Sequence, residues 1–447
     1  MAVATLRRER IDLPIDRVPE RWYNVIPDLP RLPDDYLDSA TQEAAGDAYM
    51  ERLVATPLVR QDASLERWVP IPPDVLQAYR MWRPTPLFRA HELEKHLDTT
   101  ARIYFKYEGG SPTGSFKLNT ALAQAYYTKL EGHRRMVTDT GAGQWGSAIA
   151  LAGALLDLEV LVFMVRASFH HKPYRRHLME TYGATVHPSP SSETDFGRRT
   201  LAERPDHPGS EATAVSEALE IVRGDESSRF ALGAFSNYVL LHQTVIGLET
   251  REQLDLAGED PDYLVGSVGC GSNFGGFTLP WVADKLDGRE VELVAAEPEA
   301  CPTLTQGEYR YDFSDACGTG PSVRTYTLGH DFVPPPIHAG GLRYHGSAPI
   351  VGLMHNEGLV NAVAYPQTEV FEAGRMFARL EGFVPAPETA HAIRAVVDIA
   401  QRARKDATIC FCFSGHGLLD LGAYGEFAAG RLDDVAPYRP GQNGTGS

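Results

Sequence analysis

Short apolar runs alternate with longer amphipathic segments along most of the chain. Runs rich in β-branched and aromatic residues predict strands at residues 102–106, 135–139, 160–165, 263–268, 292–297 and 408–413. Several of these runs are apolar at consecutive positions, as is typical of parallel strands covered on both faces. Helices are expected over residues 117–130, 144–156, 174–182, 237–256, 276–286 and 389–404. The alternation predicts an α/β protein with mainly parallel sheets, and the length of 447 residues suggests two sheets with a cleft between them.

The two ends of the chain break this pattern. Residues 1–65 are rich in proline and charge, and we expect them to form an N-terminal extension that wraps the surface. Residues 431–447 have the polar, glycine- and proline-rich composition of a disordered tail.

Charge and cysteine usage narrow the class of function. The formal net charge of −17 argues against nucleic acid or an anionic membrane as a partner. No apolar run reaches membrane-spanning length and the N-terminus lacks a signal-peptide core, so we expect a reduced, cytoplasmic location. The cysteines form no C-x-x-C pair and their number is odd, which predicts neither a disulfide framework nor a metal site: Cys270, Cys301, Cys317, Cys410 and Cys412.

Lys117 is the most informative single residue. It follows a turn-rich stretch of small residues, 109–116, and opens an apolar segment without a charged neighbour. Desolvation lowers the pKa of a lysine and makes its amine nucleophilic, so the position suits a lysine that forms a Schiff base. The alternative is a lysine that begins a helix and extends its amine into solvent.

Three loops at strand ends carry the other candidate chemistry. Residues 139–146 combine small residues with a helix start and predict an anion site that suits a carboxylate. Asp139 there is either the helix N-cap or an acid/base group. Residues 269–276 suit a phosphate, a dinucleotide with Glu297 on its ribose, or a plain tight turn. In residues 412–417, Ser414 either hydrogen-bonds a ligand ring nitrogen or caps a turn.

Together these motifs resemble the β chain of tryptophan synthase, and most closely its second family, which often works without an α-chain partner. The resemblance rests on residues 21–30, 83–87, 109–120, 139–146, 172–176, 241–247, 269–276, 340–346 and 414–417. It implies the two-domain architecture of fold-type II pyridoxal-phosphate enzymes, with the cofactor in the cleft between the domains. The larger, cofactor-binding domain would comprise residues 66–117 and 246–430, and the smaller, mobile domain residues 118–245.

The resemblance also assigns roles. Lys117 would bind pyridoxal 5′-phosphate and later move the Cα proton, and Ser414 would hydrogen-bond the pyridine nitrogen. Cofactor contacts are implied for Asn119, Gly269, Cys270, Gly271, Ser272, Asn273 and Glu388. Substrate contacts are implied for Thr140, Gly141, Ala142, Gly143, Gln144, Trp145 and Arg343. The family leaves room for a monovalent cation and implies a homodimer.

The implied reaction is β-replacement by a carbon–oxygen lyase. L-Serine would lose its β-hydroxyl to give an aminoacrylate, to which indole adds to form L-tryptophan. Arg343 could stabilise a departing phosphate, which would favour O-phosphoserine as the donor.

Three positions depart from the family pattern. Asp139 stands where the family has glutamate, Phe116 where it has histidine, and Cys270 where it has glycine. These changes leave open a specialised β-substituting or β-eliminating enzyme with a non-indole acceptor. A cofactor-binding homologue with little activity, acting as a partner subunit, is a further alternative. A nicotinamide oxidoreductase that uses residues 269–275 and Glu297 is the rival of a different class.

Overall fold

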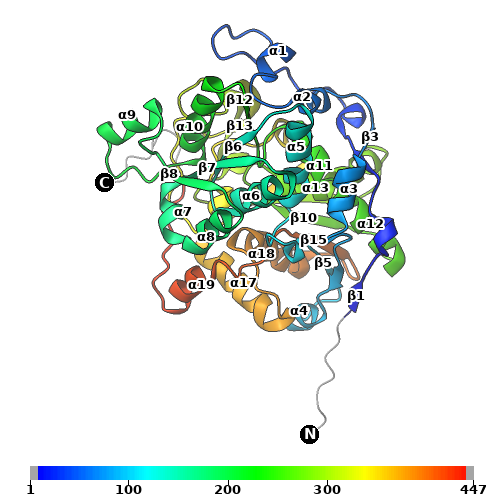
Figure 1. The fold of residues 1–447 in the computed structure, drawn as a ribbon. Coiled ribbons are helices and arrows are strands. Elements are labelled where there is room, and N and C mark those ends of the chain that lie inside the picture. The colour runs from blue at the N-terminus through cyan, green and yellow to red at the C-terminus, as the bar shows by residue number, and fades with distance from the viewer. Residues whose placement is uncertain (1–8, 439–447) are drawn as a thin grey trace.

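The computed structural model describes residues 9–438 (Figure 1). Its larger sheet has seven strands in the order β1-β4-β5-β15-β10-β11-β14. From β5 to β14 all neighbouring strands are parallel, whereas β1 and β4 add an antiparallel edge. In order across the sheet the strands are β1 (Glu9–Ile11), β4 (Leu87–Arg89), β5 (Arg102–Tyr107), β15 (Thr408–Phe413), β10 (Tyr263–Ser267), β11 (Glu292–Pro298) and β14 (Val360–Tyr365).

The smaller sheet is entirely parallel, with four strands in the order β8-β7-β6-β9. Its strands are β8 (Thr185–Ser189), β7 (Glu159–Val165), β6 (Arg135–Thr140) and β9 (Ser228–Phe230). Two short antiparallel pairs, β2–β3 and β12–β13, lie outside both sheets. They are formed by β2 (Arg21–Tyr23), β3 (Trp68–Pro70), β12 (Glu308–Phe313) and β13 (Ser322–Thr327). The predicted α/β class with mainly parallel sheets is therefore confirmed.

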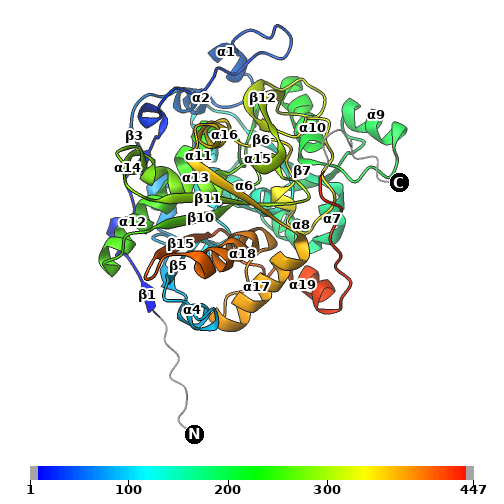
Figure 2. The ribbon, with the colours of Figure 1, turned by 180° about the vertical axis from the view of Figure 1, so that it is seen from behind.

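Helices cover both faces of the larger sheet. In Figures 1 and 2, α11 (Asn237–Gln243) and α13 (Ser272–Thr278) lie on one side of β10, and α17 (Gln367–Glu381) and α18 (Pro387–Arg402) lie on the other. This arrangement explains why β15 is buried at all six positions and reads as a continuous apolar run. On the smaller sheet, α6 (Gln144–Leu156) and α10 (Glu211–Gly224) pack against β6 and β7.

Two predicted helices are each divided in the structure. The segment 237–256 forms α11 and α12 (Val245–Ala257), which meet at Thr244. The Thr244 hydroxyl donates to the Leu241 carbonyl at 2.6 Å and accepts from the Tyr23 amide at 3.0 Å, so the N-terminal stretch is anchored at this break. The segment 276–286 is interrupted at Pro280, which has no amide hydrogen to donate. It forms the end of α13, then η4 (Leu279–Trp281) and α14 (Val282–Leu286).

Two further helices, α5 (Leu118–Leu130) and α8 (Pro173–Thr181), match predicted segments. The remaining helices lie outside the predicted segments. They are α1 (Asp47–Met50), α2 (Thr56–Asp62), α3 (Pro73–Tyr79), α4 (His91–His96), α7 (Arg166–His171), α9 (Asp195–Glu203), α15 (Thr303–Gln306), α16 (Pro349–Asn356), α19 (Leu421–Ala428), η1 (Ile15–Arg17), η2 (Ile26–Asp28), η3 (Glu108–Gly110) and η5 (Gly340–Leu342). Within residues 9–438, none of the helices has the length and apolarity that a bilayer crossing requires.

The N-terminal stretch contributes to the main core. Trp22 is fully buried and its ring lies 4.4 Å from the ring of His242, while Leu53 and Val54 belong to the same apolar cluster. Residues 1–8, and residues 439–447 of the predicted tail, lie outside the described part of the chain. The division into a larger and a smaller domain stays a prediction.

Candidate active site

A cavity of about 120 Å³ lies where loops from both sheets meet. That volume is roughly ten times what a single water molecule requires. The loops that follow β6, β10 and β15 all contribute to its lining, as expected for a ligand site at the carboxyl ends of parallel strands. Its polar lining includes Lys117, Asp139, Thr140, Gln144, Glu211, Ser272, Asn273, Glu388 and Ser414.

Lys117 stands at the start of α5 and directs its amine into this cavity. The amine donates to the Gly233 carbonyl and, at 3.1 Å, to the Ser272 hydroxyl. Burial lowers the pKa of Lys117, and the nearby Cys270 and Glu211 only partly oppose that shift. The Phe116 ring lies 5.0 Å from the amine and adds apolar surface beside it. The amine therefore faces inward, and the solvent-directed alternative does not hold.

The loop after β6 leads into helix α6. Gly143 is the N-cap of that helix and has a φ of +92°, a conformation that favours glycine. Asp139 belongs to strand β6 and does not cap the helix, so the capping alternative for this residue is wrong. The Thr140 hydroxyl accepts from the Gly146 amide at 3.1 Å and holds the turn closed. Gly141 and Ala142 also line the cavity, and small residues in such a loop suit an anion site.

Two carboxyl groups in the cavity have pKa values raised to near neutral pH. Burial raises the pKa of Asp139 to about 7, and the Lys117 amine opposes this shift. Burial, and then the neighbouring Asp139, raise the pKa of Glu211 to about 8. Sequence reasoning missed Glu211, because an acidic residue directly after a serine cap looks like an ordinary helix start.

The loop after β10 forms the opposite wall. Gly271 has a φ of +99° and is the N-cap of α13, whereas Cys270 is not among the described residues with positive φ. The departure from glycine at Cys270 therefore needs no special backbone angle. Asn273 donates to the Ser267 carbonyl at 2.7 Å, and within residues 9–438 its buried Oδ1 has no hydrogen-bond partner. The first-turn amides of α13 lack intrahelical acceptors, and it is these donors that suit this wall to an anionic group.

Ser414 and Glu388 close the third side. The Ser414 hydroxyl lies 2.9 Å from the Thr389 hydroxyl, and the Ser414 carbonyl accepts from the Phe116 amide at 3.0 Å. Glu388 accepts from the Gly341 amide at 2.9 Å and from the Gln144 side chain at 3.1 Å. These bonds join the lysine loop, the anion loop and the start of α18 around one space.

Four sequence-derived candidates lie elsewhere. Asn119 is two residues after Lys117 on a helix, about 200° around its axis, and therefore faces away from the cavity. Gly143 is covered, since a Cβ there would lie 2.7 Å from Arg175 Cβ. Arg343 donates to the Pro334 carbonyl at 2.7 Å and does not line the cavity, although Leu342 and Tyr344 do. Glu297 accepts from the amides of Leu304 and Thr305 and so caps α15.

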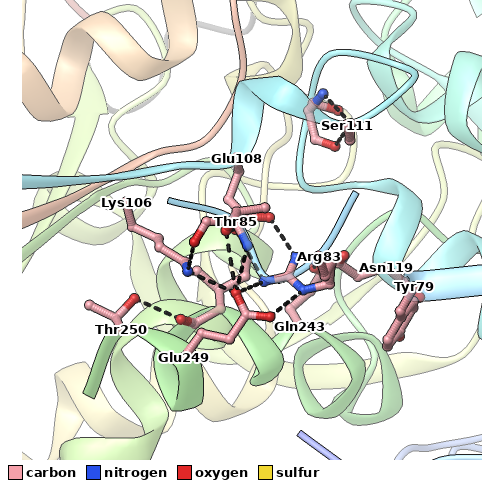
Figure 3. Close-up of polar contacts among 12 residues, drawn as sticks. Tyr79, Arg83, Thr85, Lys106, Glu108, Ser111, Asn119, Gln243, Glu249 and Thr250 are labelled. Atoms are coloured by element: carbon pink, nitrogen blue, oxygen red, sulfur yellow. Dashed lines mark hydrogen bonds and ion pairs between the residues drawn. The ribbon is translucent and has the colours of Figure 1, made fainter. Parts of the chain in front are cut away.

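A buried charge cluster lies beside the first turn of α5 (Figure 3). Arg83 is fully buried and pairs with Glu108 and Glu249, both at 2.9 Å. Lys106 also pairs with Glu249, at 2.8 Å, so Glu249 lies between the two cations. Arg83 additionally donates to Asn119 at 2.9 Å and thereby holds the first turn of α5. Asn119 thus helps to hold the helix start that carries Lys117.

The chain is similar to known proteins over most of its length. A family model for pyridoxal-phosphate dependent enzymes matches residues 79–415. Tryptophan synthase beta chain 2 of Pyrococcus abyssi is 54% identical over 96% of this chain and 98% of its own length. The protein of the same name from Thermotoga maritima is 54% identical over 93% of this chain and 99% of its own. The chain belongs to the tryptophan synthase β-chain family. It is therefore a pyridoxal-phosphate dependent enzyme of fold type II.

A solved structure supports the fold independently. The crystal structure of a threonine deaminase from T.th. superposes with a TM-score of 0.56 over 77% of this chain and 97% of that one, at 22% identity. The cavity residues of this chain fit the cofactor, because a lysine amine of lowered pKa faces the glycine-rich loop at the start of α13.

Proposed function

We propose that this enzyme catalyses β-replacement, joining an amino-acid donor such as L-serine or O-phosphoserine to indole or a related nucleophile, to give L-tryptophan or an analogue. The observation that carries the proposal is the convergence of Lys117, the 140–144 loop and Asp139 on one cavity. The names of the relatives support the donor and acceptor classes.

Each wall of the cavity then has a role. Pyridoxal phosphate, when bound, supplies the electron sink for the reaction. Lys117 would hold it and move the proton at the donor Cα, with Ser414 on the ring nitrogen and Glu388 beside the ring. The phosphate would lie on Gly269, Cys270, Gly271, Ser272 and Asn273. The donor carboxylate would lie on Thr140, Gly141, Ala142 and Gln144, with Trp145 beside it.

An apolar wall supports an aromatic acceptor. The N-terminal stretch contributes Leu53 and Val54 to the lining, and α10 contributes Val215 and Leu219. Such a wall favours a flat apolar nucleophile over water, and exclusion of water protects a reactive intermediate from hydrolysis.

Asp139 is proposed to donate a proton to the departing β-hydroxyl, which then leaves as water. Its pKa of about 7 suits this task near neutral pH. Asp139→Asn should lower the rate of L-serine turnover by about 10²-fold or more, because an amide cannot exchange that proton. Cofactor absorbance should stay unchanged. Wild-type turnover by the variant would remove Asp139 from the chemistry.

The choice of acceptor is tested by Asp139→Glu. The extra methylene moves the carboxyl by roughly 1 Å, a displacement that can change rates by about 10²-fold. If indole is the acceptor, we expect faster tryptophan formation by the variant. Loss of tryptophan formation together with loss of all donor turnover would favour a specialised enzyme with a non-indole acceptor, which Phe116 beside Lys117 also suggests.

Other expectations fare differently. The alternative of a nicotinamide oxidoreductase required Glu297 to bind a ribose. Both carboxylate oxygens of Glu297 instead accept hydrogen bonds from residues 304 and 305. Arg343 donates to the Pro334 carbonyl and does not line the cavity, so Arg343→Ala should leave the preference between serine and O-phosphoserine unchanged. The homodimer, the dispensable α-chain partner, the monovalent cation and the cytoplasmic location stay predictions.

A further inference from the structure

Glu211 lies directly against the loop that is proposed to hold the donor carboxylate. It is the first residue of α10, and Ser210 and Thr213 fix that helix start through a capping box. A Cβ built on Gly141 would lie 2.0 Å from Glu211 Oε1. The carboxyl therefore packs on the Gly141 backbone with no room for a side chain between them.

The Glu211 carboxyl has no protein partner among the described residues. None of the hydrogen bonds or ion pairs within residues 9–438 involves it, whereas Glu388 in the same cavity accepts two hydrogen bonds. Glu217, on the same helix, is likewise engaged by Ser191 and Thr194. A carboxyl group with unused hydrogen-bonding capacity thus faces the cavity where a ligand would bind.

We propose that Glu211 determines donor binding: as a neutral acid it donates a hydrogen bond to the α-carboxylate of the amino-acid donor on the 140–144 loop. This inference rests on the proposed function, which assigns that loop to the carboxylate. An ionised Glu211 would repel the donor from the same position, so donor binding requires one proton on this side chain.

The surroundings of Glu211 favour the neutral form. Burial and the neighbouring Asp139 raise its pKa to about 8, and Glu388 acts in the same direction. The Lys117 amine and the Arg343 guanidinium oppose the shift. The acid is therefore protonated at pH 7 and ionises as the pH rises through 8.

The expected consequence is weaker donor binding at high pH. The protonated fraction falls by about tenfold between pH 7 and pH 9, and the apparent Kd rises by the reciprocal of that fraction. Glu211→Gln keeps a hydrogen-bond donor and cannot ionise, so its Kd should lack this component.

The test is a titration of the holoenzyme with L-alanine at pH 7, 8 and 9. L-Alanine has the α-carboxylate and the amine but no leaving group, so the absorbance of the bound cofactor reports binding alone. The ratio of wild-type to Glu211→Gln Kd cancels the titration of the ligand and of Lys117. We expect this ratio to rise about tenfold from pH 7 to pH 9. Glu220→Gln, on the same helix but bonded to the amides of residues 195 and 196, should give the wild-type profile.

A ratio that stays constant across this range would overturn the role of Glu211. Should Glu211→Gln fail to fold, the wild-type enzyme can be titrated with ethylamine, which lacks the carboxylate. The pH dependence of its Kd is then compared with that of L-alanine, after each Kd is corrected for the titration of the ligand's own amine. Equal pH profiles for the two ligands would then contradict the inference. A holoenzyme whose absorbance does not respond to L-alanine would contradict the proposed function itself.

Discussion

Replacing Lys117 with alanine is expected to lower turnover of any amino-acid donor by roughly 10⁴-fold or more. The variant loses both the amine that binds the cofactor and the group that moves the Cα proton. Burial disfavours the charged form of the Lys117 amine, and nearby groups offset this cost only in part. Removing the amine should therefore not lower the stability of the fold. Steady-state turnover of L-serine with and without indole, together with thermal unfolding, measures both effects.

Lys129→Ala provides the matched control. Lys129 lies on the same helix α5, is exposed and donates to the Asp157 carbonyl at 2.9 Å, far from the cavity lining. It should retain wild-type turnover. Substantial turnover by Lys117→Ala, with an unchanged absorption spectrum, would show that another lysine carries the chemistry.

Replacing Arg83 with methionine is expected to lower the free energy of unfolding by about 3–5 kcal/mol. The change leaves Glu108 and Glu249 buried with Lys106 as their remaining cation. Burial opposes the charged form of Arg83, but the two glutamates outweigh it and raise the pKa of the guanidinium above its usual range. Denaturant unfolding of the apoenzyme measures the loss.

The same substitution should also reduce activity in the protein that remains folded. Arg83 donates to Asn119, and Asn119 donates to Gln243 at 2.8 Å, so the first turn of α5 loses its anchor. Arg80→Met, which removes an exposed arginine three residues earlier, should change unfolding by less than about 0.5 kcal/mol. A loss of under about 1 kcal/mol for Arg83→Met would mean that the cluster contributes little to stability.

The strands that could be predicted from the sequence are those buried on both faces. The segment 408–413 is apolar at almost every position and forms β15. By contrast, β9 has three residues and β8 contains Pro188, so neither carries a recognisable strand pattern. The burial of Trp22 in the core could not be predicted either, because this residue is one of the sparse apolar positions among prolines and charged residues.

At the site, the sequence pattern predicted which loops line the cavity, but not which of their side chains point into it. Lys117, Asp139 and Ser414 were predicted from loop context, and all three line the cavity. Asn119 and Arg343 belong to the same motifs, yet helix geometry turns the first away and a backbone carbonyl engages the second. Glu211 comes from a helix start remote in sequence, and only the tertiary fold brings it to Gly141.

Pyridoxal phosphate is expected to be attached to Lys117 in this chain. The most direct measurement is reduction of the holoenzyme with borohydride, followed by proteolysis and mass spectrometry of the labelled peptide. We expect one pyridoxyl-phosphate group, attached to Lys117. A label on another lysine, or no label on an enzyme that still turns over L-serine, would contradict it.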